Sequence, residues 1–267
     1  MDLTYDCPPT LTDSQVLEFC KTGLLRLDTI VPDEINKRVF QYCNQHDGAI
    51  PATEDWYIEN VTLNPQVVGP IRSLLGRDFT YPTAGGNHRV QGPIRITNGW
   101  HNDGGSTHKP NLDCLQVFYL PQDTPKELGP TEFLPGSHLL FSLQPWMRHY
   151  GSIRGTVLTA APAGSIFLTA YSIWHRRTSS TASEVRNLIK YWYKRTVPPE
   201  RDWIQERGFQ PKDAKHAQPG FYFHREHHRT INDVAEMFYW LCSMEDEYSS
   251  VNNLDNNLPI FLPKQAN

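Results

Sequence analysis

Hydrophobic and polar residues alternate with two different periodicities along the chain, and the first of them is that of a helix. Thr12 and Gln15 form a capping box, which predicts a helix through about Thr22, where Gly23 ends it. A short apolar strand is expected next, at Leu24 to Leu27. Two further helices are predicted from apolar residues at helical spacing. They are the segment after Pro32 with Ile35, Val39 and Tyr42, and the segment with Val234, Ala235, Phe238 and Leu241.

From about Ile94 onward, short apolar runs separated by turn residues replace the helical spacing. Several short strands at this spacing favour a sandwich or barrel over βαβ units. Among such folds, the jelly-roll and cupin group places ligands in the mouth of the barrel. The class expected is therefore mainly β with flanking helices. The runs are Leu115–Leu120, Thr131–Leu134, Ile153–Leu158, Ser165–Leu168 and Asn187–Tyr193.

Composition narrows the class of protein further. A chain of 267 residues with 39% hydrophobic residues can bury a core without disulfides or a structural metal. With a net charge of -4, the chain lacks the excess of basic residues that is typical of a nucleic-acid binder. The five cysteines form no C-x-x-C pair, and neither a signal peptide nor an apolar run long enough to span a membrane is visible. A cytoplasmic protein that binds neither nucleic acid nor membrane is expected.

Three residues have the chemistry of an iron site. His101 and Asp103 form an H-x-D triplet at the end of a predicted strand, where residues i and i+2 point to the same side. A facial triad of two histidines and one carboxylate suits Fe(II) and needs one more histidine. His175, at the end of the Ser165–Trp174 run, can supply it. Such a triad leaves coordination positions open for a 2-oxo acid and O₂.

Arg186 follows His175 by 11 residues and opens an otherwise apolar run. A buried guanidinium is costly unless it is paired, and its planar fork matches a carboxylate. The distal carboxylate of 2-oxoglutarate would serve as the partner. A structural ion pair with one of the 29 acidic residues is the other reading.

Four separated segments resemble the phytanoyl-CoA dioxygenase family, in the same order and at similar spacing. The opening L-T-D-S-Q-V-L-E-F-C-K-T-G-L-L-R-L from Leu11 is also similar, so the resemblance covers residues 11 to 196. It implies a double-stranded β-helix barrel in one oxygenase domain, 1–267. That domain would consist of a helical preface with the first strands (11–93), the barrel core (94–196) and a substrate-covering C-terminal region (197–267). The four segments are W-H-N-D at Trp100–Asp103, G-P-T-E-F-L-P-G-S-H at Gly129–His138, G-S-I-F-L-T-A-Y-S-I-W-H at Gly164–His175, and Arg186.

Carried over position by position, the resemblance implies that His101, Asp103 and His175 bind Fe(II) and are the catalytic centre. Arg186 would anchor 2-oxoglutarate. Thr131 matches a position that often contacts this cosubstrate, and Asn102 lies between two of the ligands. The activity implied is O₂-dependent oxidation of an unactivated C–H, with release of succinate and CO₂. Because a carboxylate at position 103 leaves no room for a halide, hydroxylation or a related oxidation is expected rather than halogenation.

Other polar residues receive structural interpretations. The Arg176-Arg177 pair departs from the family pattern, and solvent exposure is the preferred reading over contact with an acidic substrate. Lys190 is interpreted as a strand-edge lysine rather than a pocket residue, and His138 as part of a turn. The His224–His228 segment lacks the spacing that would place two imidazoles on one helix face.

The expected substrate is a small, largely apolar metabolite, such as a natural-product or lipid intermediate. The oligomeric state stays open, with a homodimer as one option. Two other functions use the same residues. A catalytically silent barrel would bind a ligand without forming succinate. A zinc hydrolase could use the same three ligands but would have no need for Arg186.

Overall fold

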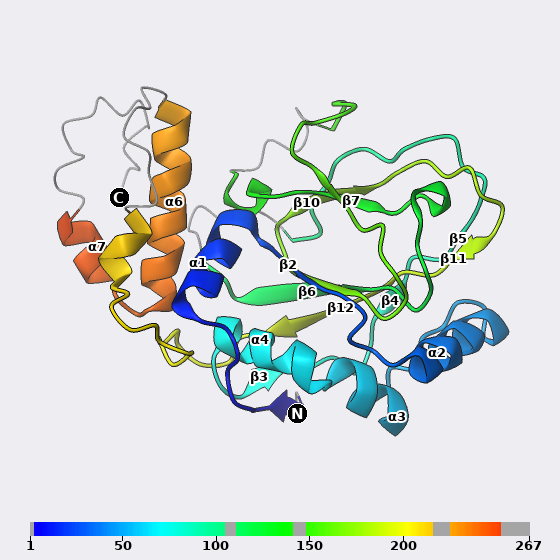
Figure 1. Ribbon diagram of the computed structural model, residues 1–267, viewed down its shortest axis with the longest axis horizontal. Coiled ribbons are helices and arrows are strands. Elements are labelled where there is room, and N and C mark those ends of the chain that lie inside the picture. Colours follow the sequence, from blue (N-terminus) through cyan, green and yellow to red (C-terminus); the bar gives the residue numbers. More distant parts are fainter. Residues whose placement is uncertain (1–2, 105–110, 141–147, 216–224, 252–267) are drawn as a thin grey trace.

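Antiparallel sheets form the centre of the protein, as the computed structural model shows for residues 3–104, 111–140, 148–215 and 225–251 (Figure 1). The largest sheet has seven strands, and a three-stranded and a two-stranded sheet accompany it. Its strands are β1 (Thr4–Tyr5), β2 (Leu24–Leu27), β3 (Phe79–Thr80), β4 (Gly86–Asn87), β6 (Cys114–Tyr119), β9 (Ile166–Ala170) and β12 (Ile189–Lys194). The three-stranded sheet consists of β7 (Thr131–Leu134), β8 (Val157–Leu158) and β10 (Trp174–Arg177), and the two-stranded sheet of β5 (Val90–Gln91) and β11 (Val185–Arg186).

The seven-stranded sheet has the order β1-β3-β12-β6-β9-β2, with β4 also paired to β12, and the three-stranded sheet has the order β10-β7-β8. These antiparallel sheets and the flanking helices confirm the mainly β class, although the described strands do not close into a barrel. β2 pairs with β9, and β3 and β4 pair with β12. The segment 11–93 therefore contributes strands to the main sheet as well as helices.

Side chains alternate between the two faces of the large sheet, as the two-residue period of a strand requires. Val117 of β6 belongs to the core that the sheet shares with the helices. Its neighbour Phe118 points the other way and packs edge-on against Phe133 of β7, with ring centroids 4.7 Å apart. The same alternation directs Gln116 of β6 and Lys190 of β12 toward the face of the sheet that carries Phe118.

Helices cover the outer face of the large sheet (Figure 1). The predicted capping box is confirmed: Thr12 accepts a hydrogen bond from the Gln15 backbone, and the Gln15 side chain accepts one from Thr12. Gly23 ends this helix in the left-handed conformation, and a Cβ there would lie 2.5 Å from the His138 ring. The helices are α1 (Asp13–Thr22), α2 (Asp33–Gln45), α3 (Asp55–Tyr57), α4 (Pro65–Leu75), α6 (Arg225–Leu241) and α7 (Glu245–Val251).

The chain after residue 196 returns to α1, and the buried carboxylate of Asp13 holds it there. Arg201 donates to both carboxylate oxygens, at 2.8 and 2.7 Å. Trp203 Nε1 and the backbone N–H of Glu206 donate at 2.9 and 2.8 Å. α6 then lies beside α1 (Figure 1). The described part of the C-terminal region is therefore attached to the helical layer.

Two of the predicted strands are divided in the structure. The Ser165–Trp174 run splits at a turn into β9 and β10, which belong to different sheets. The strand expected from Arg186 to Tyr193 splits into β11 and β12. Among the described helices, none combines the length and the apolar character needed to cross a membrane.

Candidate metal centre

His101 and His175 are brought together by a backbone pairing that the sequence does not reveal. The segment before His101 runs antiparallel to β10, and the two histidines lie directly opposite each other. Each donates its backbone N–H to the carbonyl of the other, at 3.0 and 2.8 Å. Residues paired in this way project their side chains to the same face of a sheet. The two imidazole rings accordingly lie 4.4 Å apart between centroids.

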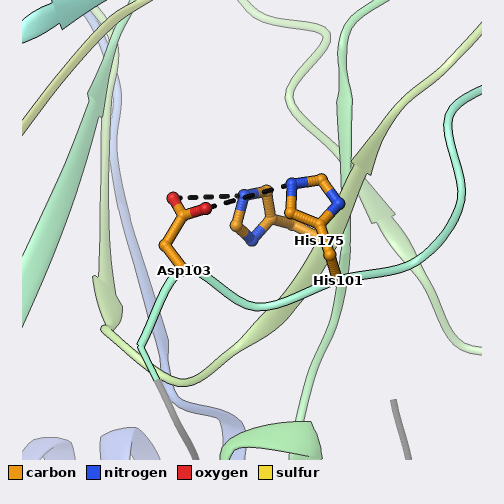
Figure 2. A group of neighbouring side chains, drawn as sticks. All are labelled: His101, Asp103 and His175. Carbon is orange, nitrogen blue, oxygen red and sulfur yellow. Dashed lines mark ion pairs between the residues drawn. The ribbon is translucent and has the colours of Figure 1, made fainter. Parts of the chain in front are cut away.

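Asp103 completes a group of three possible ligands (Figure 2). Its Oδ2 lies 3.6 Å from His175 Nε2, and its Oδ1 lies 4.0 Å from His101 Nε2. One donor atom from each residue can be chosen so that all lie within 4.8 Å of one another. Donor atoms bound to one cation at about 2.1 Å lie roughly 3.0 to 3.4 Å apart. The group therefore fits a divalent cation after a small inward movement.

Hydrogen bonds fix which ring nitrogens face this group. His101 Nδ1 lies 3.0 Å from the Gly99 carbonyl oxygen, and His175 Nδ1 lies 3.1 Å from that of Ile173. A carbonyl oxygen only accepts, so both Nδ1 atoms carry hydrogen and the Nε2 atoms present lone pairs to the centre. Metal-binding histidines are commonly oriented by a bond of this kind. Burial, with the Lys190 ammonium, lowers the pKa of His175 to about 3, so its ring is neutral.

Lys190 and Gln116 also contact Asp103, and neither was predicted as a site residue. Lys190 Nζ forms an ion pair with Asp103 Oδ2 and lies 3.2 Å from His175 Nε2. Gln116 Nε2 donates to the same carboxylate oxygen at 2.8 Å. Burial alone would raise the pKa of Asp103, but attraction from the Lys190 ammonium and these hydrogen bonds lower it overall. Asp103 is therefore ionised.

The interpretation of Lys190 as a strand-edge residue was wrong. β12 pairs with β6 on one side and with β3 and β4 on the other, so it is an interior strand. The Lys190 side chain is buried, and its Nζ lies 4.7 Å from the centre of the Phe118 ring. A lysine within the otherwise apolar run Ile189–Tyr193 was the available signal. Its four-residue spacing from Arg186 pointed the same way.

A cavity of about 430 Å³ opens beside the three candidate ligands, within the range usual for small-molecule sites. Arg89, Arg177, Arg186 and Lys190 contribute to its wall, and none of the described residues that line it is acidic. An anionic ligand therefore suits this space. The other lining residues are Asn87, His88, Val90, Asn98, His101, Phe118, Thr131, His175 and Leu188.

Arg186 lies in the cavity wall with only 2% of its surface exposed. It donates to the Gly129 carbonyl at 2.7 Å and to that of His88 at 3.5 Å. Its Nε has no hydrogen-bond partner, and it forms no ion pair with any acidic residue that the structure describes. Burial and the nearby Arg177 lower its pKa to about 10, so it remains a cation at neutral pH. The structural ion pair, the alternative reading of this arginine, is absent among the described residues.

Thr131 and Asn102 differ in their relation to the cavity. Thr131 is buried on β7 and lines it, as the prediction of a cosubstrate contact requires. Asn102 lies between two ligand residues but does not line the cavity, and its buried Nδ2 has no hydrogen-bond partner among the described residues. The structure thus brings Thr131, but not Asn102, to the cavity wall.

The expectation that Arg176 and Arg177 face solvent was wrong for the first and incomplete for the second. Arg176 is buried, pairs with Glu132 at 2.7 Å and covers the Trp100 ring at 4.5 Å. Arg177 lines the cavity and bonds to the Ile96 carbonyl and the Asn98 side chain, at 3.0 and 3.1 Å. Successive side chains of β10 point to opposite faces of the strand, so Arg176 and Arg177 lie on different sides. Arg176 has a structural role, and Arg177 offers a cation near the cavity opening.

The two other histidine predictions concern residues away from this centre. His138 is buried in a turn, with Nε2 3.1 Å from the Cys20 carbonyl, and it is not part of the ligand group. The His224–His228 segment lies outside the residues whose side chains the structure describes.

Comparisons with known proteins show a shared fold. No protein-family model matches the chain. HygX from Streptomyces hygroscopicus, solved with nickel and 2-oxoglutarate bound, aligns with a TM-score of 0.57 at 15% identity over 80% of this chain and 97% of that one. The non-haem monooxygenase ThoJ, in a nickel complex, aligns with 0.54 at 14% identity over 87% and 99%. AviO1 from Streptomyces viridochromogenes Tue57 aligns with 0.51 at 14% identity over 70% and 96%. The protein therefore shares the fold of these three proteins over almost their whole length.

Proposed function

We propose that the protein is an Fe(II)- and 2-oxoglutarate-dependent oxygenase that oxidises an unactivated C–H of a small molecule. One observation carries the proposal. A cluster of two histidines and one carboxylate lines or adjoins a cavity whose described charged wall residues are all cationic. One of them is the Arg186 guanidinium, which forms no ion pair with any described acidic residue. Two histidines and a carboxylate on one face are the ligand set of non-haem Fe(II) oxygenases. HygX, which shares the fold, has been solved with iron bound and with 2-oxoglutarate bound.

The choice of 2-oxoglutarate as cosubstrate follows from the positive charges in the cavity wall. A dicarboxylate would present one carboxylate to the histidine end of the cavity and the other to Arg186. A bidentate arginine–carboxylate contact is among the strongest hydrogen-bonded pairs. Arg186 offers it without competition from any described acidic residue. Thr131, in the same wall, would add a neutral hydrogen-bond donor.

Each residue then has a defined task. His101, Asp103 and His175 would hold the cation, which when bound would supply O₂ activation coupled to decarboxylation of 2-oxoglutarate. Hydrogen bonds from His101 and His175 to backbone carbonyls keep their Nε2 atoms directed inward. Phe118 and Leu188 contribute apolar surface to the cavity wall, which would help to exclude water once substrates are bound. The protein thus positions and shields the reactants.

The remaining features complete the proposal. The fold would be a double-stranded β-helix in a single domain, 1–267, in a cytoplasmic protein. The phytanoyl-CoA dioxygenase family remains the suggested relationship. A largely apolar natural-product or lipid intermediate remains the suggested substrate, and Arg177 could bind an acidic group on it. None of the described residues that line the cavity comes from 197–267, and a covering role for that region remains a prediction.

Anaerobic addition of Fe(II) and then 2-oxoglutarate tests the proposal directly. A visible metal-to-ligand charge-transfer band is expected, and it should be lost in His101→Ala and weakened in Arg186→Met. Succinate formation under air, followed by mass spectrometry, measures turnover. If neither the band nor succinate appears with any substrate of a metabolite panel, the oxygenase proposal is wrong. Hydrolysis by the zinc-loaded protein without 2-oxoglutarate would favour a hydrolase.

A metal-free anion-binding protein is the second candidate, and the position of Lys190 favours it. The ammonium group already supplies a positive charge to Asp103 inside the ligand group. A protein of this kind would bind 2-oxoglutarate equally well with and without a divalent cation. Calorimetric titration of 2-oxoglutarate into the chelator-treated and the Mn(II)-loaded protein distinguishes the two candidates.

A further inference from the structure

The ammonium group of Lys190 lies among the candidate metal ligands, where a side-chain cation is unusual. Its Nζ pairs with Asp103 Oδ2 and lies 3.2 Å from His175 Nε2, so it contacts two of the atoms proposed to bind the metal. Since His175 Nδ1 carries the ring hydrogen, the ammonium donates to the Nε2 lone pair. Lys190 therefore uses the same electron pairs that a metal ion would use.

We propose that Lys190 is a displaceable counter-ion, which neutralises Asp103 in the metal-free protein and turns to the anionic cosubstrate when the metal binds. This inference rests on the proposed function, because it concerns the same site. It assigns Lys190 a positioning role that couples the loading of the cation to the loading of the anion.

Displacement is required by the geometry. His175 Nε2 and Asp103 Oδ2 are 3.6 Å apart, and a cation shared by them must lie within about 2.1 Å of each. The ammonium contacts the same two atoms. Two positive charges a few ångströms apart in a buried site repel strongly. The metal and the ammonium therefore cannot occupy their positions at the same time.

The fold leaves the lysine a route to the cavity. Its backbone is fixed on both sides, paired with Phe118 of β6 and Gly86 of β4. Its side chain has four rotatable bonds and follows the Phe118 ring, and Lys190 itself lines the cavity. A small change in these torsions moves the ammonium from Asp103 toward the cavity without moving the strand. A carboxylate bound there would replace Asp103 as its partner.

Displacement of Lys190 should couple the binding of the metal to the binding of 2-oxoglutarate. Without an anion, the metal must break the Lys190–Asp103 pair and leave a buried ammonium unpaired, so its affinity is reduced. With 2-oxoglutarate present, the ammonium gains a new partner and the penalty falls. By linkage, each ligand then strengthens binding of the other.

The experiment measures the Mn(II) dissociation constant by electron paramagnetic resonance, with and without 2-oxoglutarate, in the wild type and in Lys190→Met. Without 2-oxoglutarate, the variant should bind Mn(II) roughly 10- to 100-fold more tightly, because a hydrogen bond between charged groups no longer competes. The gain in Mn(II) affinity caused by 2-oxoglutarate should be about tenfold smaller in the variant than in the wild type.

A control variant separates displacement from a general loss of positive charge. Lys194→Met removes an exposed lysine from the same strand. It should not raise the Mn(II) affinity by more than about twofold. Lys190→Gln keeps a hydrogen-bond donor without the charge, so it should behave like Lys190→Met and provides a second test if the methionine variant does not fold.

The outcomes distinguish this inference from the proposed function. Equal or weaker Mn(II) binding by both position-190 variants overturns the inference and leaves the metal centre intact. A wild type that binds no Mn(II) even with 2-oxoglutarate, beside variants that do, shows a permanent counter-ion and overturns both. Absence of Mn(II) binding in every folded variant overturns the metal centre itself.

Discussion

Asp13 and Asp103 are two carboxylates that the fold uses in opposite ways. Asp13, at the start of α1, has no exposed surface and receives four hydrogen bonds, from Arg201, Trp203 and the backbone of Glu206. The Asp103 side chain is 28% exposed, contacts Lys190 and Gln116, and adjoins two imidazole nitrogens beside a cavity.

The difference lies in what remains available for binding. Each carboxylate oxygen of Asp13 already has two partners, and these join α1 to the chain after residue 196. At Asp103 both protein contacts from Lys190 and Gln116 fall on Oδ2, while Oδ1 faces His101 Nε2 at 4.0 Å. A saturated buried carboxylate stabilises a fold, whereas one with a free oxygen beside two imidazole nitrogens can bind a cation. Burial alone would not separate the two roles.

Asp13→Ala should produce the largest effect, on folding. Removing one partner of a buried ion pair leaves the other charge uncompensated and costs about 3 kcal/mol or more. Denaturant unfolding followed by circular dichroism measures the loss. Mn(II) affinity under native conditions should stay unchanged, because Asp13 lies in the helical layer. A variant as stable as the wild type would contradict the structural role.

His101→Ala should produce the second largest effect, a loss of metal binding. Removal of residues that only orient metal ligands lowers metal affinity or activity about 10- to 100-fold. Removal of a ligand itself should therefore lower the Mn(II) affinity more than about 100-fold. Mn(II) titration and succinate formation measure it. His88→Ala is the matched control, since His88 lines the cavity but is not part of the ligand group. Equal Mn(II) loss in both variants would show that the cluster does not define the site.

Arg186→Met should weaken 2-oxoglutarate binding by about 10- to 100-fold, as expected for hydrogen bonds to a charged group. Isothermal titration in the presence of Mn(II) measures it. Metal affinity without 2-oxoglutarate should change little, because Arg186 forms no ion pair with Asp103. Arg26→Met is a control, because Arg26 is an exposed arginine paired with Asp28. Unaltered 2-oxoglutarate binding in Arg186→Met would leave the cosubstrate anchor unassigned.

The smallest effect concerns pH. Burial by itself would raise the pKa of Asp13, but hydrogen bonds from Arg201, Glu206 and Trp203 lower it overall. A lowered folded-state pKa contributes stability that is complete above the unfolded value, about 3.9, and is lost as pH falls through the folded value. The difference in unfolding free energy between the wild type and Asp13→Asn should therefore shrink below about pH 4. A difference that is constant from pH 7 to pH 3 would contradict the assignment.

Several features of the site could be predicted from the sequence because they depend on neighbouring residues. The capping box at Thr12 and Gln15 involves residues three positions apart, and the H-x-D triplet uses the two-residue period of an extended chain. Arg186 was recognisable because a charged residue in an apolar run requires a partner or a ligand. His175 was proposed as the third ligand from its place at the end of the Ser165–Trp174 run, and the segments that resemble the phytanoyl-CoA dioxygenase family indicated the same residue.

The tertiary structure decided which distant residues meet. Lys190 and Gln116 reach Asp103 because β12 and β6 pair in a register that turns both side chains to the inner face, and Arg176 and Arg177 separate because they lie on opposite faces of β10. Sheet register depends on packing between strands far apart in the chain, and a shift by one residue would reverse every side chain. Local chemistry thus proposed the ligands by itself, whereas the charge balance around them was set by long-range strand pairing.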